Sequence, residues 1–268
     1  MIGKITKTLA LIMTLLLTLT LFSGCGKKGL TQEEAYKIYY DTIEKFVPEI
    51  MTEPQECDVE ITTRDEVTYL SEHFVRNLYT KIQSQNVDGK LQYYMLGEFP
   101  EANHWDFDCI NGDKFYSIYS TEYNRKGTLK EWNIEMMPSF LFVSLNTPFF
   151  KEDAIKSFEV EQKGTDTVAT FVIDGTKMEE GYDKRVMKEI SPRVEDKLDD
   201  VIIVLTIDEN GTPKTMSTKI SMSIFNSSGK LHAQKTLNMD FVFNKLDNVD
   251  FDLKEVASKY AEDASMIQ

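Results

Sequence analysis

The residues best suited to catalysis are few, and they do not form a known catalytic pattern. Ser227 and Lys230 have the S-x-x-K spacing in which a lysine assists a serine nucleophile. They lie at the tip of a predicted hairpin, whereas that chemistry needs the start of a buried helix. His73, His104 and His232 each stand alone on a strand-like segment, and neither H-E-x-x-H nor G-x-S-x-G occurs. The sequence therefore predicts a protein that is not an enzyme and has no cofactor.

A calcium loop is the nearest match to a metal site. Asp106, Asp108, Asn111 and Gly112 form D-x-D-x-x-N-G, which departs by one residue from the spacing of such a loop. The same residues belong to a segment that alternates around Asn111-Gly112, which is typical of a β-hairpin. We therefore expect no metal here.

Two cysteines, Cys57 and Cys109, remain in the body of the chain, and two interpretations stay open for them. Each falls on the apolar face of a predicted strand, Cys57 with Val59 and Cys109 with Phe107. An exported protein could join them in a disulfide. Two buried free thiols are the other interpretation.

Alternation of apolar and polar residues predicts that most of the chain is β-sheet. The alternating pattern begins at Cys57. Residues 67–83 also suit a helix, but they are assigned to a strand because Asn86–Gly89 then forms a turn. The following hairpin places Trp105, Phe107 and Cys109 on one face, and Asp106 and Asp108 on the other. In the C-terminal half, three strands are joined by turns at 209–213 and 226–229. The last of them has an apolar face of Leu231, Ala233, Leu237, Met239, Phe241 and Phe243.

Helical spacing appears at the N-terminal side and in the middle of the chain. Thr31 followed by Glu34 fits a capping box, and an aromatic stripe then predicts a helix over 31–47 that packs on a sheet. Residues 177–190 have helical spacing, and 135–150 form an apolar segment that begins a short helix near Pro138. Both mid-chain segments are suited to closing one side of a curved sheet.

The first 24 residues have the pattern of a signal peptide. Lys4 and Lys7 precede an apolar run that ends at Ser23 and Gly24, directly before Cys25. This ending resembles the lipobox of bacterial lipoproteins, although Phe22 stands where that family prefers Leu, Val or Ile. The resemblance implies cleavage after residue 24, acylation of Cys25 and a tether over 25–30. A plain signal peptide with an incidental cysteine is the alternative.

The charge balance argues against nucleic acid as a partner. The net charge is −14, and it becomes −16 once residues 1–24, which hold two lysines and no acid, are removed. Such a surface repels a phosphate backbone. A single domain over 31–268 is expected, since neither a linker rich in Pro, Gly and Ser nor a repeat of fixed period is present.

The element order, with an aromatic "INGDKFYS" hairpin and a closing "FNKLDNVDFD", resembles lipoproteins with a LolA/LppX-like half-barrel. The resemblance implies an α+β fold, a strongly curved antiparallel β-sheet with an N-terminal helix and mid-chain helices on its concave side. It also implies an extracytoplasmic protein on the cell membrane that binds a lipid or other apolar ligand. The alternative is an interaction or sensory module for envelope proteins. Ligand contacts are expected from Phe140, Phe142, Leu145 and Phe149, and the alternative is that these side chains fill a core.

Overall fold

The computed structural model describes residues 29–46, 55–69, 71–102, 104–122, 126–133, 150–177, 195–226 and 228–267. The chain divides into two units, Met1–Thr31 and Gln32–Gln268, and the whole sheet belongs to the second. The expected mid-chain helices at 135–150 and 177–190 fall almost entirely outside the described residues.

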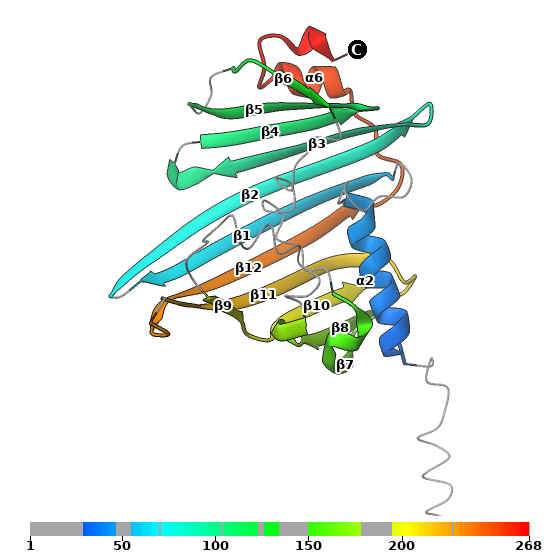
Figure 1. The fold of residues 1–268 in the computed structure, drawn as a ribbon. Coiled ribbons are helices and arrows are strands. Elements are labelled where there is room, and N and C mark those ends of the chain that lie inside the picture. The colour runs from blue at the N-terminus through cyan, green and yellow to red at the C-terminus, as the bar shows by residue number, and fades with distance from the viewer. Residues whose placement is uncertain are drawn as a thin grey trace, which may run out of the picture. The chain divides into compact units, whose positions relative to one another are not determined.

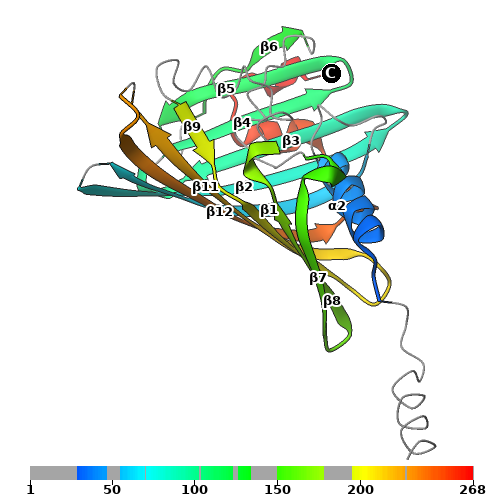
Figure 2. The ribbon, with the colours of Figure 1, turned by 60° about the horizontal axis from the view of Figure 1, so that its bottom comes forward.

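One twisted and curved antiparallel sheet of twelve strands dominates the unit Gln32–Gln268 (Figures 1 and 2). Its order is β6-β5-β4-β3-β2-β1-β12-β11-β10-β8-β7, with β9 paired to β11. The first six strands are β1 Cys57–Tyr69, β2 Glu72–Val87, β3 Lys90–Phe99, β4 His104–Asn111, β5 Lys114–Glu122 and β6 Lys130–Asn133. The others are β7 Ile155–Lys163, β8 Asp166–Ile173, β9 Glu195–Leu198, β10 Val201–Ile207, β11 Pro213–Phe225 and β12 Leu231–Lys245. The α+β class with a curved antiparallel sheet is therefore confirmed.

Tight turns connect the strands where the sequence predicts them. Asp88 and Gly89 both have positive φ, 54° and 77°, as a two-residue hairpin turn of the primed type requires. Gly112 has φ 64° in the turn between β4 and β5. Of the segment 67–83, which suited either a helix or a strand, residues 67–69 end β1 and residues 72–83 belong to β2.

The strand pairing joins two sequential meanders. Strands β1 to β6 follow one another across one half of the sheet, and β12 then pairs antiparallel with β1. In this pair Val59 lies opposite Phe243, and Ile61 opposite Phe241. The first and last strands of the sheet thus meet at its centre, where both are long.

Helix α2, Gln32–Phe46, packs on one face of this centre, which we call the α2 face. The Phe46 ring lies 5.8 Å from that of Phe241 and 6.0 Å from that of Phe243. Tyr39 contacts the rings of Phe150 and Phe171 at 5.2 and 6.3 Å. The aromatic stripe of the expected 31–47 helix is therefore a packing face.

A second helix, α6 Leu253–Ser258, and the short 3-10 helix η5 Ala264–Met266 pack on the opposite face of β3, β4 and β5. The register places Met95 beside Ile82 and hence on the α2 face, so its neighbours Tyr94 and Leu96 point to the other side. We call that side the α6 face. The sequence analysis predicted no helix here. Two further 3-10 turns are η2 Pro100–Ala102 and η4 Glu152–Ala154.

Alternation along the strands agrees with the predicted faces, with one exception. Trp105, Phe107 and Cys109 are all buried on the α6 face, whereas Asp106 and Asp108 are only half-buried on the other side. In β12 the predicted face is buried from Ala233 to Phe243. Leu231 is the exception, 52% exposed, because it stands at the start of the strand next to the Asn226–Lys230 turn.

Candidate ligand-binding face

The register arranges the α2 face into rows that cross the sheet, and three rows beyond α2 form a continuous surface. We call these three rows the central stripe. The first row contains Leu78, Thr63, Met239, Thr218 and Ile203. The second contains Arg76, Asp65, Leu237 and Ile220, and the third contains Phe74, Val67, Lys235 and Met222.

Burial falls along the central stripe from the first row to the third. Met239 and Thr218 are 1% and 2% exposed in the first row, and Leu237 and Ile220 are still buried in the second. In the third row Val67 and Met222 are half-buried, and Phe74 is 52% exposed. The central stripe therefore reaches solvent at its third row.

A charged cluster interrupts the apolar surface where burial begins to fall. The Asp65 side chain is buried, and its Oδ2 accepts from Arg76 Nη2 at 2.5 Å. Lys235 Nζ lies 3.3 Å from the same oxygen. Asp65 Oδ1 is buried and has no hydrogen-bond partner among the described residues. Two cationic groups therefore surround one carboxylate on a face that is otherwise mostly apolar.

Thr218 is the second polar feature of the central stripe. Its neighbours across the sheet are Met239 and Ile203, both buried. Its Oγ1 is buried and has no hydrogen-bond partner within the described part of the chain. Leaving a buried hydroxyl unpaired costs about 1–3 kcal/mol, so most buried polar groups in proteins have partners.

The α2 face continues over β3, β4 and β5, where it carries the carboxyl group of Asp108. Asp108 lies between Met95 and Ser117, and the Ser117 hydroxyl accepts from Trp132 Nε1 at 3.0 Å. Burial, together with the smaller effect of the neighbouring Asp106 carboxyl, raises the pKa of Asp108 to about 7. This carboxyl is therefore close to half protonated at neutral pH.

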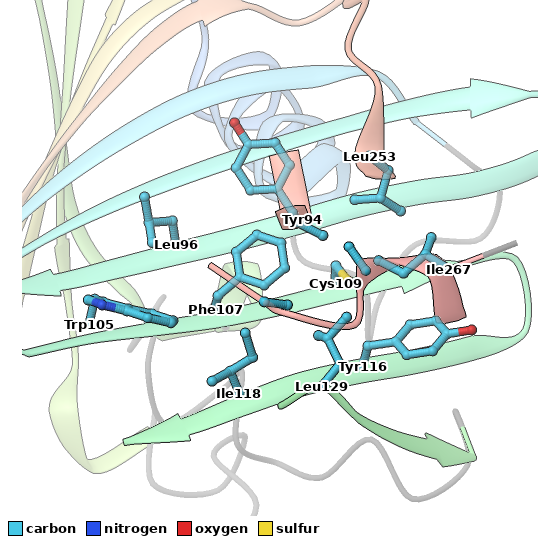
Figure 3. Close-up of a cluster of buried hydrophobic side chains, with 13 residues drawn as sticks. Tyr94, Leu96, Trp105, Phe107, Cys109, Tyr116, Ile118, Leu129, Leu253 and Ile267 are labelled. Atoms are coloured by element: carbon cyan, nitrogen blue, oxygen red, sulfur yellow. The ribbon is translucent and has the colours of Figure 1, made fainter. Parts of the chain in front are cut away.

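The α6 face of the same three strands is a closed core instead. Tyr94, Phe107 and Tyr116 pack there with Leu253 and Ala257 of α6 (Figure 3). Its tyrosine hydroxyls have partners, since Tyr94 donates to Gln83 Oε1 and Tyr116 to the Met266 carbonyl at 3.4 Å. This cluster has the composition and the polar pairing of an ordinary protein interior.

Two depressions lie away from the central stripe. One, of about 530 Å³, is lined by Leu198, Asp199, Asp200, Ile202, Lys219 and Ser221. The other, of about 470 Å³, is lined mainly by polar residues of β3, β4 and β5, and its Lys114 pairs with Glu131 at 2.5 Å. Neither has the apolar lining that a lipid needs.

Most of the site residues expected from the sequence lie outside the described residues. These are Cys25 and the four expected ligand contacts, Phe140, Phe142, Leu145 and Phe149. The next residue, Phe150, is buried against the helix, and its carbonyl accepts from Tyr36 Oη at 2.9 Å.

The disulfide interpretation of Cys57 and Cys109 is wrong, because both are buried free thiols. They lie on opposite faces of the sheet, in β1 and β4. Three strand spacings of ~4.8 Å put them on the order of 14 Å apart, against ~4.4–6.8 Å between the Cα atoms of a disulfide. Cys57 Sγ lies 3.1 Å from Ser84 Oγ instead, and burial raises the pKa of Cys57 to about 12.

Sequence reasoning missed the polar residues of the central stripe. Lys235 interrupts the apolar alternation between Ala233 and Leu237, and Asp65 likewise follows Thr63 on the face of Ile61. A charge at an inward position of a strand is a detectable signal. The sequence pattern does not predict that Asp65 and Lys235 lie close together, because the pairing of β1 with β12 joins distant parts of the chain.

Comparison with known proteins gives matches to solved structures alone. No protein-family model matches the chain, and no curated protein matches it. A LolA superfamily protein from Nitrosomonas europaea is 8% identical with a TM-score of 0.27, covering 80% of this chain and 94% of that one. An outer membrane lipoprotein-sorting protein domain from Vibrio parahaemolyticus is 13% identical with a TM-score of 0.28, covering 85% and 100%.

A DUF1329 family protein from Desulfovibrio piger is 7% identical with a TM-score of 0.28, covering 81% of this chain and 94% of that one. The LolA-like likeness expected from the sequence thus recurs among solved structures. TM-scores of this size carry no argument about function, which has to come from the residues of this chain.

Two features are absent from the described residues. No described helix has both the length and the apolar character needed to cross a bilayer. Likewise, no group of three or more His, Cys, Asp or Glu side chains in the described ranges is placed to hold a metal ion.

Proposed function

We propose that this chain is a membrane-anchored extracytoplasmic protein that binds a lipid or another apolar ligand on its α2 face. It acts by holding the ligand and performs no catalysis. The acyl group on Cys25 anchors it to the outer side of the cell membrane. There the ligand is a membrane lipid or a molecule that moves between the membrane and its surroundings.

The central stripe is the observation that carries the binding proposal. Met239, Leu237 and Ile220 continue the apolar surface beyond α2, and it reaches solvent at Phe74 and Met222. A closed core has no need of a solvent-reaching end or of an unpaired hydroxyl such as that of Thr218. A ligand that enters at the third row would cover the exposed apolar groups.

The anchor is supported by the order of residues before the described unit. A positive start, an apolar run and Cys25 after Ser23-Gly24 match the lipobox pattern. Two or three acyl chains hold a protein on a membrane stably, whereas one chain does so only marginally. Cys25→Ala should therefore move the protein to the soluble fraction or leave it unprocessed. A variant that is processed and stays membrane-bound would contradict the anchor.

The binding proposal is tested by extracting the purified protein, expressed without residues 1–25, with organic solvent and identifying lipids by mass spectrometry. A fluorescent fatty acid then measures uptake in solution. Met222→Gln combined with Ile224→Asn makes the solvent-reaching end polar, since both side chains are half-buried on the α2 face. We expect weaker uptake with little change in melting temperature.

Ser223→Asn is the matched control, because this residue lies between the two and points to the opposite face. Phe140→Ser with Phe142→Ser tests the ligand contacts expected from the sequence in the same assay. If the wild-type protein carries no lipid and takes up no probe, the binding proposal is wrong. Crosslinking in cells that recovers one dominant protein partner would then favour the interaction module.

A further inference from the structure

We propose that the end of the sheet formed by its two longest hairpins docks on the surface of a lipid bilayer. This end, which we call the hairpin end, consists of residues 64–76 of the β1–β2 hairpin and 221–235 of the β11–β12 hairpin. It includes the third row of the central stripe. The inference rests on the proposed function, and it adds the surface through which the protein contacts the membrane.

The hairpin end carries the most exposed apolar side chains. Phe74 and Leu231 are each 52% exposed, more than any other large apolar side chain in the described part of the chain. Tyr69 is 37% exposed, and its ring lies 4.6 Å from that of His232, so the two hairpins are in contact near their tips. Figures 1 and 2 both show these tips side by side. Single exposed apolar residues are ordinary, whereas a group of them at one end of a molecule indicates an interaction surface.

The residue types at the hairpin end suit the interface of a bilayer. Aromatic side chains are enriched where head groups meet acyl chains, and Lys and Arg there extend their charged ends toward the head groups. Tyr69 and Phe74 supply the aromatic rings. The Arg76 side chain is 71% exposed, and Lys230 is exposed directly before Leu231. Apolar groups and long basic side chains therefore occur together at this end.

The charge balance separates the hairpin end from the rest of the molecule. Its two segments contain four basic and three acidic residues, and β9, which pairs with β11 there, adds one basic and two acidic residues. This region is therefore neutral, and the whole net charge of −14 lies elsewhere in the chain. Among its acids, Asp65 is buried beside Arg76 and Lys235, and Glu66 pairs with Arg64 at 2.7 Å. Anionic lipids would repel the acidic remainder, which favours contact through this end.

The chain before α2 is long enough to permit this contact. Gln32 follows Cys25 by seven residues, which span at most about 25 Å when fully extended. The start of α2 and the hairpin end both lie toward the lower side of Figure 1. An acyl anchor on Cys25 can therefore hold the protein with its hairpin end on the bilayer, and it keeps that end at a high local concentration near the lipid.

Flotation with lipid vesicles tests the proposal. The protein is expressed without residues 1–25, so that no acyl group contributes, and the vesicles contain phosphatidylglycerol and phosphatidylcholine in equal parts. We expect the wild-type protein to float with the vesicles. Phe74→Ser with Leu231→Ser should lower its partition coefficient at least about tenfold, because both changes remove apolar surface that the bilayer would cover. Both side chains are 52% exposed, so the variant should still fold.

Val87→Ser with Met266→Ser is the matched control. These side chains are 40% and 38% exposed, and both line the polar depression of about 470 Å³. Val87 is the last residue of β2, whose first residues belong to the hairpin end, so the control pair lies at the opposite end of the sheet. This pair should leave the partition coefficient unchanged.

Phe74→Trp gives a second measurement that does not depend on loss of binding. Its tryptophan fluorescence, compared with that of the wild-type protein, should shift to the blue when vesicles are added and be quenched by brominated acyl chains. Val87→Trp should show neither response, because it would remain in water.

A wild-type protein that does not float, or an equal loss in the two serine pairs, would overturn the docking surface. If that protein still takes up the fluorescent fatty acid, the proposed function stands without this surface. A wild-type dimer that Phe74→Ser with Leu231→Ser dissociates, together with no vesicle binding, would assign the hairpin end to a second copy of the chain instead. Absence of carried lipid and of probe uptake would contradict the proposed function whether or not the protein floats.

Discussion

The two faces of the sheet bury apolar residues in different ways. On the α6 face, the cluster around Phe107 is covered by α6 and η5, and its buried tyrosine hydroxyls have partners. On the α2 face, the central stripe continues beyond the helix, reaches solvent at Phe74, and contains a buried hydroxyl without a partner. The two faces differ more clearly in whether their buried hydroxyl groups have hydrogen-bond partners than in their apolar composition. The first is a completed core, and the second is the face on which we propose that a ligand binds.

The largest expected effect tests the register that defines the two faces. Ile220→Asp places a charge on the α2 face of β11, where Ile220 is 7% exposed, and should cost several kcal/mol of folding free energy. Ser221→Asp lies one residue on, points to the α6 side and is half-buried, so it should be tolerated far better. Thermal unfolding measures both. Equal melting temperatures would contradict the assigned faces.

The next effect tests whether the α6 face is a core. Phe107 is fully buried and its ring lies 5.2 Å from that of Tyr260 and 6.0 Å from that of Tyr94. Phe107→Ala should therefore cost about 3–5 kcal/mol, measured by denaturant unfolding. Asp106→Ala, on the other face of the same strand, serves as the control and should cost much less. A loss below about 1 kcal/mol for Phe107→Ala would mean that this cluster is not tightly packed.

Local alternation predicted which side chains share a face, but it could not predict what covers each face. Trp105, Phe107 and Cys109 alternate with aspartates, and a one-residue shift would expose all three, so their common face was predictable. Helix α6 was missed because it has only six residues. Asp252 accepts from the Glu255 backbone N–H at 3.0 Å, and this D-x-x-E spacing was the signal available.

The charged cluster was harder to predict, for a physical reason. Asp65 and Arg76 are neighbours through the β1–β2 hairpin, whereas Lys235 joins them only because β12 returns to the centre of the sheet. No periodicity in one strand specifies which strand lies beside it. The charged residues at inward positions were detectable in the sequence, but their contact with one another was not.

A third prediction concerns the polar end of the α2 face and its dependence on pH. The pKa of Asp108, raised to about 7 by burial and by Asp106, exceeds the value of ~3.9 for an unfolded chain. Its stabilising contribution is therefore present in full below about pH 4 and is lost as the pH rises through 7. Asp108→Asn removes this loss, so the variant should gain stability relative to the wild type between pH 5 and pH 8.

A pKa raised from ~3.9 to about 7 corresponds to roughly 4 kcal/mol for a fully buried group, at ~1.4 kcal/mol per pKa unit. The expected gain is smaller, about 1–2 kcal/mol, because the Asp108 side chain is only half-buried and solvent screens its charge. Denaturant unfolding at several pH values measures it. Asp106→Asn is the control and tests how much the Asp106 carboxyl contributes to the raised pKa of Asp108. This change should lower the pKa of Asp108 and make the stability depend less on pH. Parallel stability curves for wild type and Asp108→Asn would contradict the raised pKa.

The smallest effect bears most directly on the comparison of the two faces, because it removes one hydroxyl from each. Tyr94→Phe deletes a hydroxyl that donates to Gln83 on the α6 face, and this should cost about 1 kcal/mol. Thr218→Val deletes a buried hydroxyl that has no partner among the described residues, at nearly constant volume, so the lipid-free protein should keep its stability or gain about 1 kcal/mol. Denaturant unfolding of the lipid-free wild-type protein and of both variants measures whether each change lowers or raises the free energy of unfolding. A loss for Thr218→Val equal to that for Tyr94→Phe would mean that the Thr218 hydroxyl is paired after all. The central stripe would then be a completed core like the α6 face, without the unpaired polar atom that a ligand would satisfy.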